Sequence, residues 1–211
     1  MNILRDTPPA PYARLLLAHG AGAPMDSAFM NRVAQGLSEA GIEVWRFEFP
    51  YMAARRAGGG KRPPDRQPVL LDTWGELIHQ ARGDHADGPL FIGGKSMGGR
   101  MASLVADKAA VDGWVCLGYP FHPVGKPERP RIEHLHTLRT PSLIVQGSRD
   151  ALGNRERVAD YPLSSHIQIH WLEDGDHDFK PRVRSGFTQD QHLADAVAQV
   201  DAFIKRTARN L

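Results

Sequence analysis

Short apolar runs alternate with longer amphipathic stretches along most of the chain. The apolar runs cover residues 14–20, 42–50, 89–96, 113–120, 142–150 and 166–175. Most of them carry consecutive apolar residues, which is typical of strands buried on both faces. The helical candidates between them cover residues 27–40, 69–82, 97–109 and 188–207, with a weaker one at 153–160. This order predicts an α/β fold with a mostly parallel sheet of about six strands and helices on both faces.

Local signals mark the ends of the first predicted helix. Asp26 stands directly before it as a candidate N-cap, and Gly41 follows its last residue. A short polar side chain at the N-cap accepts an otherwise unpaired backbone N–H, and glycine adopts the left-handed conformation that often ends a helix. We therefore expect a helix over residues 27–40.

Two segments interrupt the alternation of strands and helices. Residues 51–68 contain three successive glycines and five basic residues against one acid, and residues 119–141 are rich in proline and histidine. Each follows a predicted strand, so each leaves a parallel sheet at its carboxyl edge, where open α/β folds bind ligands. They are either ordinary solvated loops or the rim of a site. As a rim, we expect them to have a structural role and not a catalytic one.

Length, composition and charge limit the possible functions. A chain of 211 residues with 41% hydrophobic and 24% charged residues fits one domain, which we expect to span residues 1–211 with a core of about 12–207. Nucleic-acid binding calls for a basic stripe on one face, and the formal net charge of +2 gives no indication of one. We find no signal peptide and no apolar run long enough for a membrane span. We therefore expect a cytoplasmic protein with no membrane or nucleic-acid partner, and leave the oligomeric state open.

The strongest local motif is Gly94-Lys95-Ser96-Met97-Gly98, between a predicted strand and a predicted helix. A serine on such a sharp turn stands exposed above the sheet, and the small flanking residues allow the backbone to turn tightly. The amides at the start of the helix point toward developing negative charge. The motif alone is weak, but its position predicts Ser96 as a nucleophile.

The same residues also resemble the end of a phosphate-binding loop. That motif requires a glycine five residues before Gly94, where this chain has Pro89. The intervening residues read as the interior of a strand and not as a flexible cradle. The sequence therefore favours the serine nucleophile.

A hydroxyl nucleophile needs a base, and the base needs a third group that fixes its tautomer. Asp150 closes one apolar run, and His177 follows the next one. Serine, acid and histidine thus occur in this order at one edge of the predicted sheet. The alternatives are a helix N-cap for Asp150 and a solvated loop residue for His177. Three further acids close to the histidine are competing partners: Asp174, Asp176 and Asp178.

An acyl-transfer site also needs donors for the oxyanion. The backbone N–H of Met97, directly after the serine, is one candidate. The second should come from the loop after the first central strand, His19-Gly20-Ala21-Gly22. We expect Ala21 to supply it, with Gly22 as the alternative within the loop. A simple tight turn is the other interpretation.

Other polar residues carry weaker signals. His134 and His136 have no obvious third metal ligand. The acidic loop around His177 fails as a calcium loop, because Phe179 and Ser185 replace its essential glycine and glutamate. Cys116 is the single cysteine, which excludes an internal disulfide, and its apolar run places it in the core. The sequence therefore predicts no metal site.

Several stretches together resemble the dienelactone-hydrolase-like α/β-hydrolases over about residues 12–205. They are LLLAHGAGAPMDS, RFEFPYM, KRPPDR, FIGGKSMGGRMAS, LGYPFHPVGKPERPRIEHL, PSLIVQGSRDALG and EDGDHDF. FPYM, RPPDR and GYPFHPVGKPER resemble most closely a small branch that includes a testis-expressed protein and a subunit of the non-specific-lethal histone acetyltransferase complex. Dienelactone hydrolases proper have cysteine where this chain has Ser96, which puts that substrate in doubt.

The resemblance implies a single-domain α/β-hydrolase fold without a large cap domain. It implies Ser96, Asp150 and His177 as a catalytic triad, Ala21 and Met97 as the oxyanion hole, and no cofactor. The expected function is hydrolysis of a carboxylic ester on a small-molecule acyl substrate. The alternatives are a thioesterase or peptidase on the same site, and a non-catalytic protein-interaction module with this fold.

Overall fold

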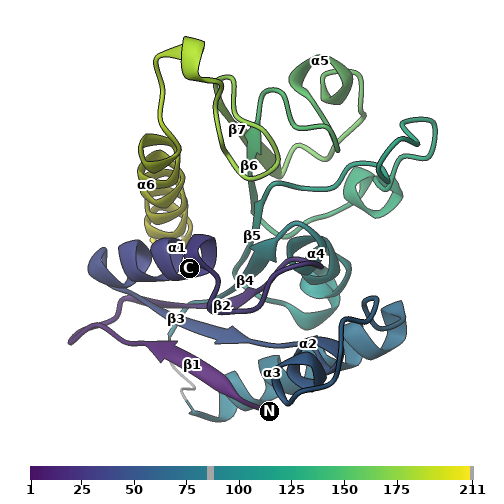
Figure 1. Cartoon of the computed structure of the whole chain (residues 1–211). Helices are drawn as coiled ribbons and strands as arrows, with labels where there is room; N and C mark the ends of the chain where they lie inside the picture. The colour runs from purple at the N-terminus through teal and green to yellow at the C-terminus, as the bar shows by residue number, and fades with distance from the viewer. Residues whose placement is uncertain (85–87, 210–211) are drawn as a thin grey trace.

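The computed structural model describes residues 1–84 and 88–209, which fold around one seven-stranded sheet. The strands lie in the spatial order β1-β3-β2-β4-β5-β6-β7 (Figure 1). Every neighbouring pair is parallel except β1 and β3. The strands are β1 (Ile3–Asp6), β2 (Ala13–Ala18), β3 (Ile42–Phe47), β4 (Leu90–Lys95), β5 (Gly113–Leu117), β6 (Ser142–Gly147) and β7 (Ile167–Leu172).

The α/β class is confirmed, but the predicted count of six strands was one short. The additional strand, β1, is antiparallel and pairs Ile3 with Phe47 at the edge of the sheet. It has only four residues, is partly exposed, and lacks a regular alternation of apolar and polar residues. Its position is fixed by tertiary contacts, including the ion pair of 2.9 Å between Arg46 and Asp6. A pattern of apolar residues therefore could not identify it.

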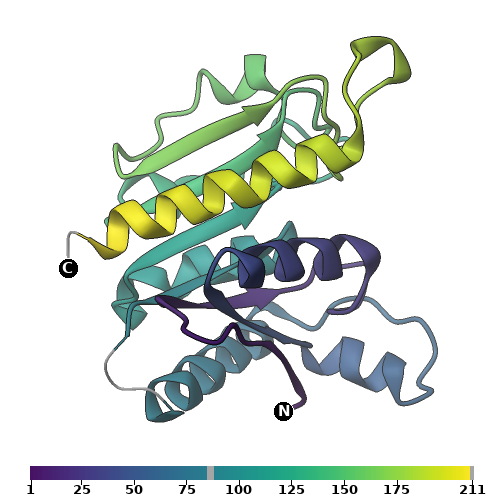
Figure 2. The same ribbon diagram turned by 90° about the vertical axis from the view of Figure 1, so that its left-hand side faces the viewer.

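Helices cover both faces of the sheet (Figures 1 and 2). Helices α1 and α6 pack against each other on one face, and α3 packs against α4 on the other. The helices are α1 (Ala28–Glu39), α2 (Pro50–Arg56), α3 (Gln67–Asp84), α4 (Met97–Ala109), α5 (Arg155–Val158) and α6 (Gln189–Ala208), with 3₁₀ turns at Glu133–His136 and Val183–Ser185. Within residues 1–84 and 88–209, none of the helices combines the length and apolar character needed to cross a membrane.

Two local expectations were wrong. The N-cap of α1 is Ser27, whose hydroxyl accepts from the Met30 N–H at 3.4 Å, while Asp26 pairs with Arg56 instead. Residues 51–68 begin as helix α2 and not as a loop. Proline occupies the first turn of α2, where its missing N–H costs no hydrogen bond, and Tyr51 anchors the helix in the core.

The apolar core lies on both sides of the sheet. One cluster includes Trp45, Trp74 and Trp114, and the other includes Phe91 and Phe203, all fully buried. This packing holds the carboxyl ends of the central strands in place, and the loops that follow β2, β4, β6 and β7 leave the sheet there.

Cys116 lies within this core, in strand β5 beneath the start of α4. Its side chain is fully buried, and burial raises the pKa of its thiol. A β-carbon added to Gly99 would lie 2.4 Å from its sulfur, so glycine at that position allows α4 to approach β5 closely. The single cysteine thus packs as a small apolar side chain.

Candidate active site

The turn from β4 into α4 holds Ser96 in a conformation that few non-glycine residues adopt. Its backbone has φ 51° and ψ −116°, and its N–H donates to the Leu117 carbonyl at 3.0 Å. Such a conformation costs about 1–3 kcal/mol and persists only where the surrounding structure imposes it. Ser96 is the N-cap of α4, yet its hydroxyl makes no capping bond, so it is available to another partner.

Glycines make room for this turn. A β-carbon on Gly94 would lie 2.6 Å from the Ala18 carbonyl oxygen, and one on Gly98 would lie 2.4 Å from the His19 carbonyl oxygen. Both distances are far below van der Waals contact. The two glycines therefore allow the elbow to sit directly against the end of β2, whose following loop approaches the serine.

Ser96, His177 and Asp150 form a continuous line of hydrogen bonds. His177 Nε2 lies 2.8 Å from Ser96 Oγ, and His177 Nδ1 lies 2.7 Å from Asp150 Oδ2. Asp150 follows β6 and is buried; it also accepts bonds from Gln146 Nε2 at 2.9 Å and from the Leu152 N–H at 2.8 Å. An aspartate fixed in this way accepts a hydrogen bond from Nδ1–H and so keeps the proton of the neutral ring on Nδ1, which leaves Nε2 free to accept a proton from the serine.

The three acids near His177 have other partners. Asp174 pairs with Arg182 and Arg149, and these contacts hold the pKa of its carboxyl well below the usual range. Asp176 accepts backbone N–H groups from Asp178 and Lys180, each at 2.9 Å. They therefore shape the loop that carries His177, while Asp150 contacts its ring. Asp150 is also not a helix N-cap, since Asn154 caps α5.

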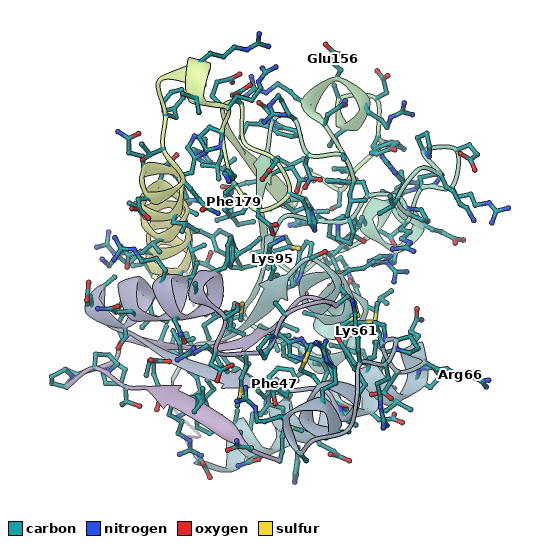
Figure 3. All side chains as sticks on the ribbon, viewed as in Figure 1. Phe47, Lys61, Arg66, Lys95, Glu156 and Phe179 are labelled. Atoms are coloured by element: carbon teal, nitrogen blue, oxygen red, sulfur yellow. The ribbon has the colours of Figure 1, made fainter. Side chains whose placement is uncertain are left out.

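Lys95, at the end of β4, connects the elbow to the histidine loop. Its Nζ donates to the His177 backbone carbonyl at 2.7 Å and lies 3.2 Å from the Asp178 carboxylate. Burial lowers the pKa of this ammonium, and the nearby Asp178 counteracts the effect. Figure 3 shows Lys95 near the centre of the molecule, where the strand ends meet.

The loop after β2 is held by side chains on both sides of it. His19 Nε2 accepts from the Phe49 N–H at 3.2 Å, so Nδ1 carries the proton that is donated to the Gly20 carbonyl at 2.6 Å. Burial lowers the pKa of His19, which favours this neutral form. The Tyr51 hydroxyl donates to the Ala21 carbonyl at 2.9 Å. Because a trans peptide points its C=O and N–H in opposite directions, the bond to Gly20 also fixes the direction of the Ala21 N–H.

Ser96 and Ala21 lie between two pockets. The first has a volume of about 410 Å³ and is lined partly by Met97 and by both interrupting segments of the sequence, 51–68 and 119–141. The second has a volume of about 340 Å³ and is lined partly by Phe29 and by His177. Larger hollows of about 600 and 910 Å³ lie elsewhere and include neither Ser96 nor Ala21. The carboxyl edge of the sheet therefore offers space on two sides of the serine.

A second serine–histidine pair lies in and beside α4. His134 Nε2 is 2.8 Å from Ser103 Oγ, but that hydroxyl donates to the Arg100 carbonyl at 2.7 Å. His134 must then donate to the hydroxyl and does not act as its base. Ser103 is also buried inside a helix, so this pair is a packing contact. Neither His134 nor His136 belongs to a group of three metal-ligand residues within the described part of the chain.

Comparison with known proteins identifies the family. A sequence model described as "Alpha/beta hydrolase domain" matches residues 11–205. The chain belongs to this family. Among solved structures, it is similar to an α/β serine hydrolase without a lid from Xanthomonas campestris, at 17% identity and a TM-score of 0.70, over 99% of this chain and 88% of that one.

Two further solved structures share the fold of this alpha/beta hydrolase. Est1E from Butyrivibrio proteoclasticus, with ferulic acid bound, has 17% identity and a TM-score of 0.72, over 98% of this chain and 94% of that one. A dienelactone hydrolase from Anabaena variabilis has 17% identity and a TM-score of 0.68, over 95% of this chain and 88% of that one. At this identity the likeness establishes the fold.

The supporting roles of several residues at the site were not predicted from the sequence. Lys95 and Gln146 each interrupt an apolar run, and a polar residue inside a buried strand is itself a signal that it has a specific partner. Tyr51 gave no such signal, because its contact with the loop after β2 depends on the unforeseen helix α2. The alpha/beta hydrolase site thus depends on contacts between segments far apart in the chain.

Proposed function

We propose that this alpha/beta hydrolase cleaves carboxylic esters, with Ser96 as nucleophile, His177 as base and Asp150 as the acid that orients it. The observation that carries the proposal is the line of two hydrogen bonds, 2.8 Å and 2.7 Å long, that joins the three side chains. The strained turn at Ser96 and the complete burial of Asp150 support the same roles.

In the first half of the reaction, Ser96 Oγ attacks the ester carbonyl carbon while its proton passes to His177 Nε2. The tetrahedral intermediate then breaks its bond to the alcohol oxygen, and the imidazolium returns the proton to the departing alcohol. In the second half, a water molecule attacks the acyl-enzyme with His177 again as base, and the carboxylic acid leaves as Ser96 regains its proton. Asp150 stabilises the imidazolium without taking its proton.

The oxyanion hole in this proposal consists of the backbone N–H groups of Ala21 and Met97. Met97 is the first residue of α4, where amide groups are not used by the helix itself. The bonds from His19 and Tyr51 to the neighbouring carbonyls hold the Ala21 peptide in place. A donor of this kind contributes about 3–4 kcal/mol of transition-state stabilisation.

The named relatives agree with an ester substrate. The structure of Est1E contains bound ferulic acid, and the protein from Anabaena variabilis is named a dienelactone hydrolase. The enzyme acts on a small-molecule acyl substrate without a cofactor. A dienelactone is not assigned as that substrate, since this chain has Ser96 where dienelactone hydrolases proper have cysteine. Membership of the small branch with a testis-expressed protein and a histone acetyltransferase subunit also belongs to this proposal, and rests on the sequence resemblance alone.

Labelling with a fluorophosphonate probe tests the proposal directly. We expect the wild type to react covalently and Ser96→Ala to remain unlabelled and to lose ester hydrolysis. Ser103→Ala is a matched control, because it removes the serine of the other serine–histidine pair, and it should still be labelled. Full turnover in Ser96→Ala would overturn the assignment. Absence of labelling in folded wild type would instead favour the protein-interaction module. Parallel thioester and peptide substrates identify the bond that is cleaved.

A further inference from the structure

The pocket of about 410 Å³ beside Ser96 contains two arginine side chains that have no carboxylate partner. Arg100 and Arg131 both line it. Within the described residues, neither guanidinium lies within 4 Å of a carboxylate and neither donates a side-chain hydrogen bond to the protein. The two buried arginines of the described residues do have such partners: Arg14 with Glu43 and Arg46 with Asp6.

Arg100 is held one helical turn beyond the nucleophile. Its backbone N–H donates to the Ser96 carbonyl at 2.9 Å, so its position follows that of the elbow. Its side chain is half-buried, and Nε is fully buried without a hydrogen-bond partner. A buried guanidinium N–H without an acceptor in the protein is costly, so this group needs an acceptor from outside the chain, such as a ligand, a water or an ion.

Arg131 reaches the same pocket from the 119–141 segment. Its backbone is fixed by a 2.7 Å bond to the Phe121 carbonyl and by the Tyr119 hydroxyl, which donates to its own carbonyl at 2.8 Å. Burial lowers the pKa of its guanidinium, and the positive charge of Arg100 lowers it further. Placing two like charges in the pocket beside Ser96 therefore has an unfavourable electrostatic free energy in the absence of an anion.

The other titratable groups near this pair leave the charge uncompensated. Asp65 also lines the pocket, but its carboxylate accepts the Tyr51 N–H at 2.8 Å and forms no ion pair with either arginine. His134 bonds to Ser103, and burial together with the positive charge of Arg100 lowers its pKa to about 4, so it is neutral near pH 7. The pocket is thus positive at neutral pH.

The geometry points to a binding site for an oxyanion group of the substrate, a carboxylate or a phosphate, between Arg100 and Arg131. This inference rests on the proposed function, because the anion would belong to the same molecule as the ester that Ser96 attacks. Guanidinium groups bind both anions with paired, charge-assisted hydrogen bonds. An anion here would accept the unpaired N–H groups and relieve the repulsion between the two side chains.

The second pocket has a different character: Phe29 and Met30 are in its wall, and its two charged side chains, Lys95 and Asp178, pair with each other at 3.2 Å. It suits an uncharged group on the other side of the scissile bond. The preferred substrate class is therefore an ester with an anionic group on one side of the reacting carbonyl and an uncharged group on the other.

The test compares esters that differ only in charge. Mono-4-nitrophenyl adipate carries a free carboxylate, and its methyl ester is the neutral match; 4-nitrophenyl 5-phosphonopentanoate distinguishes a phosphate-type anion from a carboxylate. All rates are corrected for hydrolysis without enzyme. We expect the wild type to favour at least one anionic ester by tenfold or more in kcat/KM. Arg100→Met and Arg131→Met should each reduce this preference about tenfold to a hundredfold.

Arg129→Met is the matched control, because Arg129 is exposed in the same segment and does not line the pocket. It should keep the wild-type preference, which separates a specific site from a general positive field. Equal kcat/KM for charged and neutral esters in the wild type would overturn the inference without any variant. So would a preference that survives in both Arg100→Met and Arg131→Met.

Binding without turnover separates this inference from the proposed function. Calorimetry with Ser96→Ala and monomethyl adipate, compared with dimethyl adipate, measures recognition of the anion alone. Tighter binding of the monoester, lost in the double variants with Arg100→Met or Arg131→Met, supports the arginine pocket even if Ser96 proves not to be the nucleophile. Equal binding of the two compounds overturns the pocket, even if Ser96 is labelled by the fluorophosphonate.

Discussion

The ammonium of Lys95 donates a hydrogen bond of 2.7 Å to the backbone carbonyl of His177. Lys95 is the residue directly before the proposed nucleophile, and His177 is the proposed base. One buried side chain therefore ties the strand that carries one reacting group to the loop that carries the other. The distance between Ser96 and His177 depends on this contact as well as on the packing of the sheet.

Replacing Lys95 by methionine should slow the chemical step. The substitution keeps the apolar stem and removes the bond to the His177 carbonyl, so the imidazole loses part of its positioning. We expect kcat to fall about tenfold to a hundredfold, with KM changed less than threefold. Steady-state kinetics and the rate of fluorophosphonate labelling measure this. Asp178→Asn is the control, because it removes only the exposed counter-ion of Lys95 and should lower kcat less than threefold.

The Asp150→Asn variant should retain the fold and lose activity. An asparagine keeps the shape of the side chain, but its amide can donate to Nδ1 and so favours the tautomer in which Nε2 carries the proton. We expect a loss of about 10⁴ in kcat, as for the equivalent change in a serine protease triad. Asp176→Asn changes a neighbouring acid that bonds only to backbone N–H groups, and it should keep most of the activity. Equal losses in the two variants would contradict the role of Asp150.

The sequence predicted the parts of this molecule that depend on local patterns. Six strands and the main helices followed from the apolar pattern, because the five central strands, β2 to β6, are buried throughout; β7 is partly exposed. The position of Ser96 between β4 and α4 followed from a motif with a local steric cause. Strand β1 and helix α2 were missed, since both are short and are fixed by long-range contacts. The presence of Arg100 and Arg131 in one pocket depends on the path of the 119–141 segment, which no local pattern specifies.

Two glycine-to-alanine substitutions should have opposite effects on stability. In Gly98→Ala the new methyl group would collide with the His19 carbonyl oxygen at 2.4 Å, and we expect a loss of about 1–3 kcal/mol in the free energy of unfolding. Gly75 is exposed in the middle of α3 with open space around it, so Gly75→Ala should stabilise the protein by about 0.5–1 kcal/mol. Urea unfolding measures both. Destabilisation by Gly75→Ala would show that the surface of α3 has a further contact.

Stability should decrease on acidification through His134. Its pKa is lowered from 6.5 to about 4 in the folded state, so the unfolded chain binds the proton more tightly. This contribution is fully present above about pH 6.5 and is lost as the pH falls toward 4. After allowance for solvent screening of the half-buried ring, we expect about 1–2 kcal/mol.

The His134→Gln variant identifies this contribution. It removes the titrating group, so its unfolding free energy should fall less between pH 6.5 and 4.5 than that of the wild type. His136→Gln is the control, since His136 is exposed on the same 3₁₀ turn, and it should follow the wild-type profile. Parallel pH profiles for wild type and His134→Gln would show that another group controls the loss.

Because Cys116 is buried between β5 and α4, the modification of its thiol measures how often these two elements separate. A thiol reagent reaches this sulfur only when α4 separates from β5, because the closed structure leaves it no accessible surface and keeps it protonated. As the chain has no second cysteine, the rate of modification reports the free energy of that one separation. Comparing this rate with and without a bound acyl group would show how far occupation of the serine stiffens the elbow beneath it.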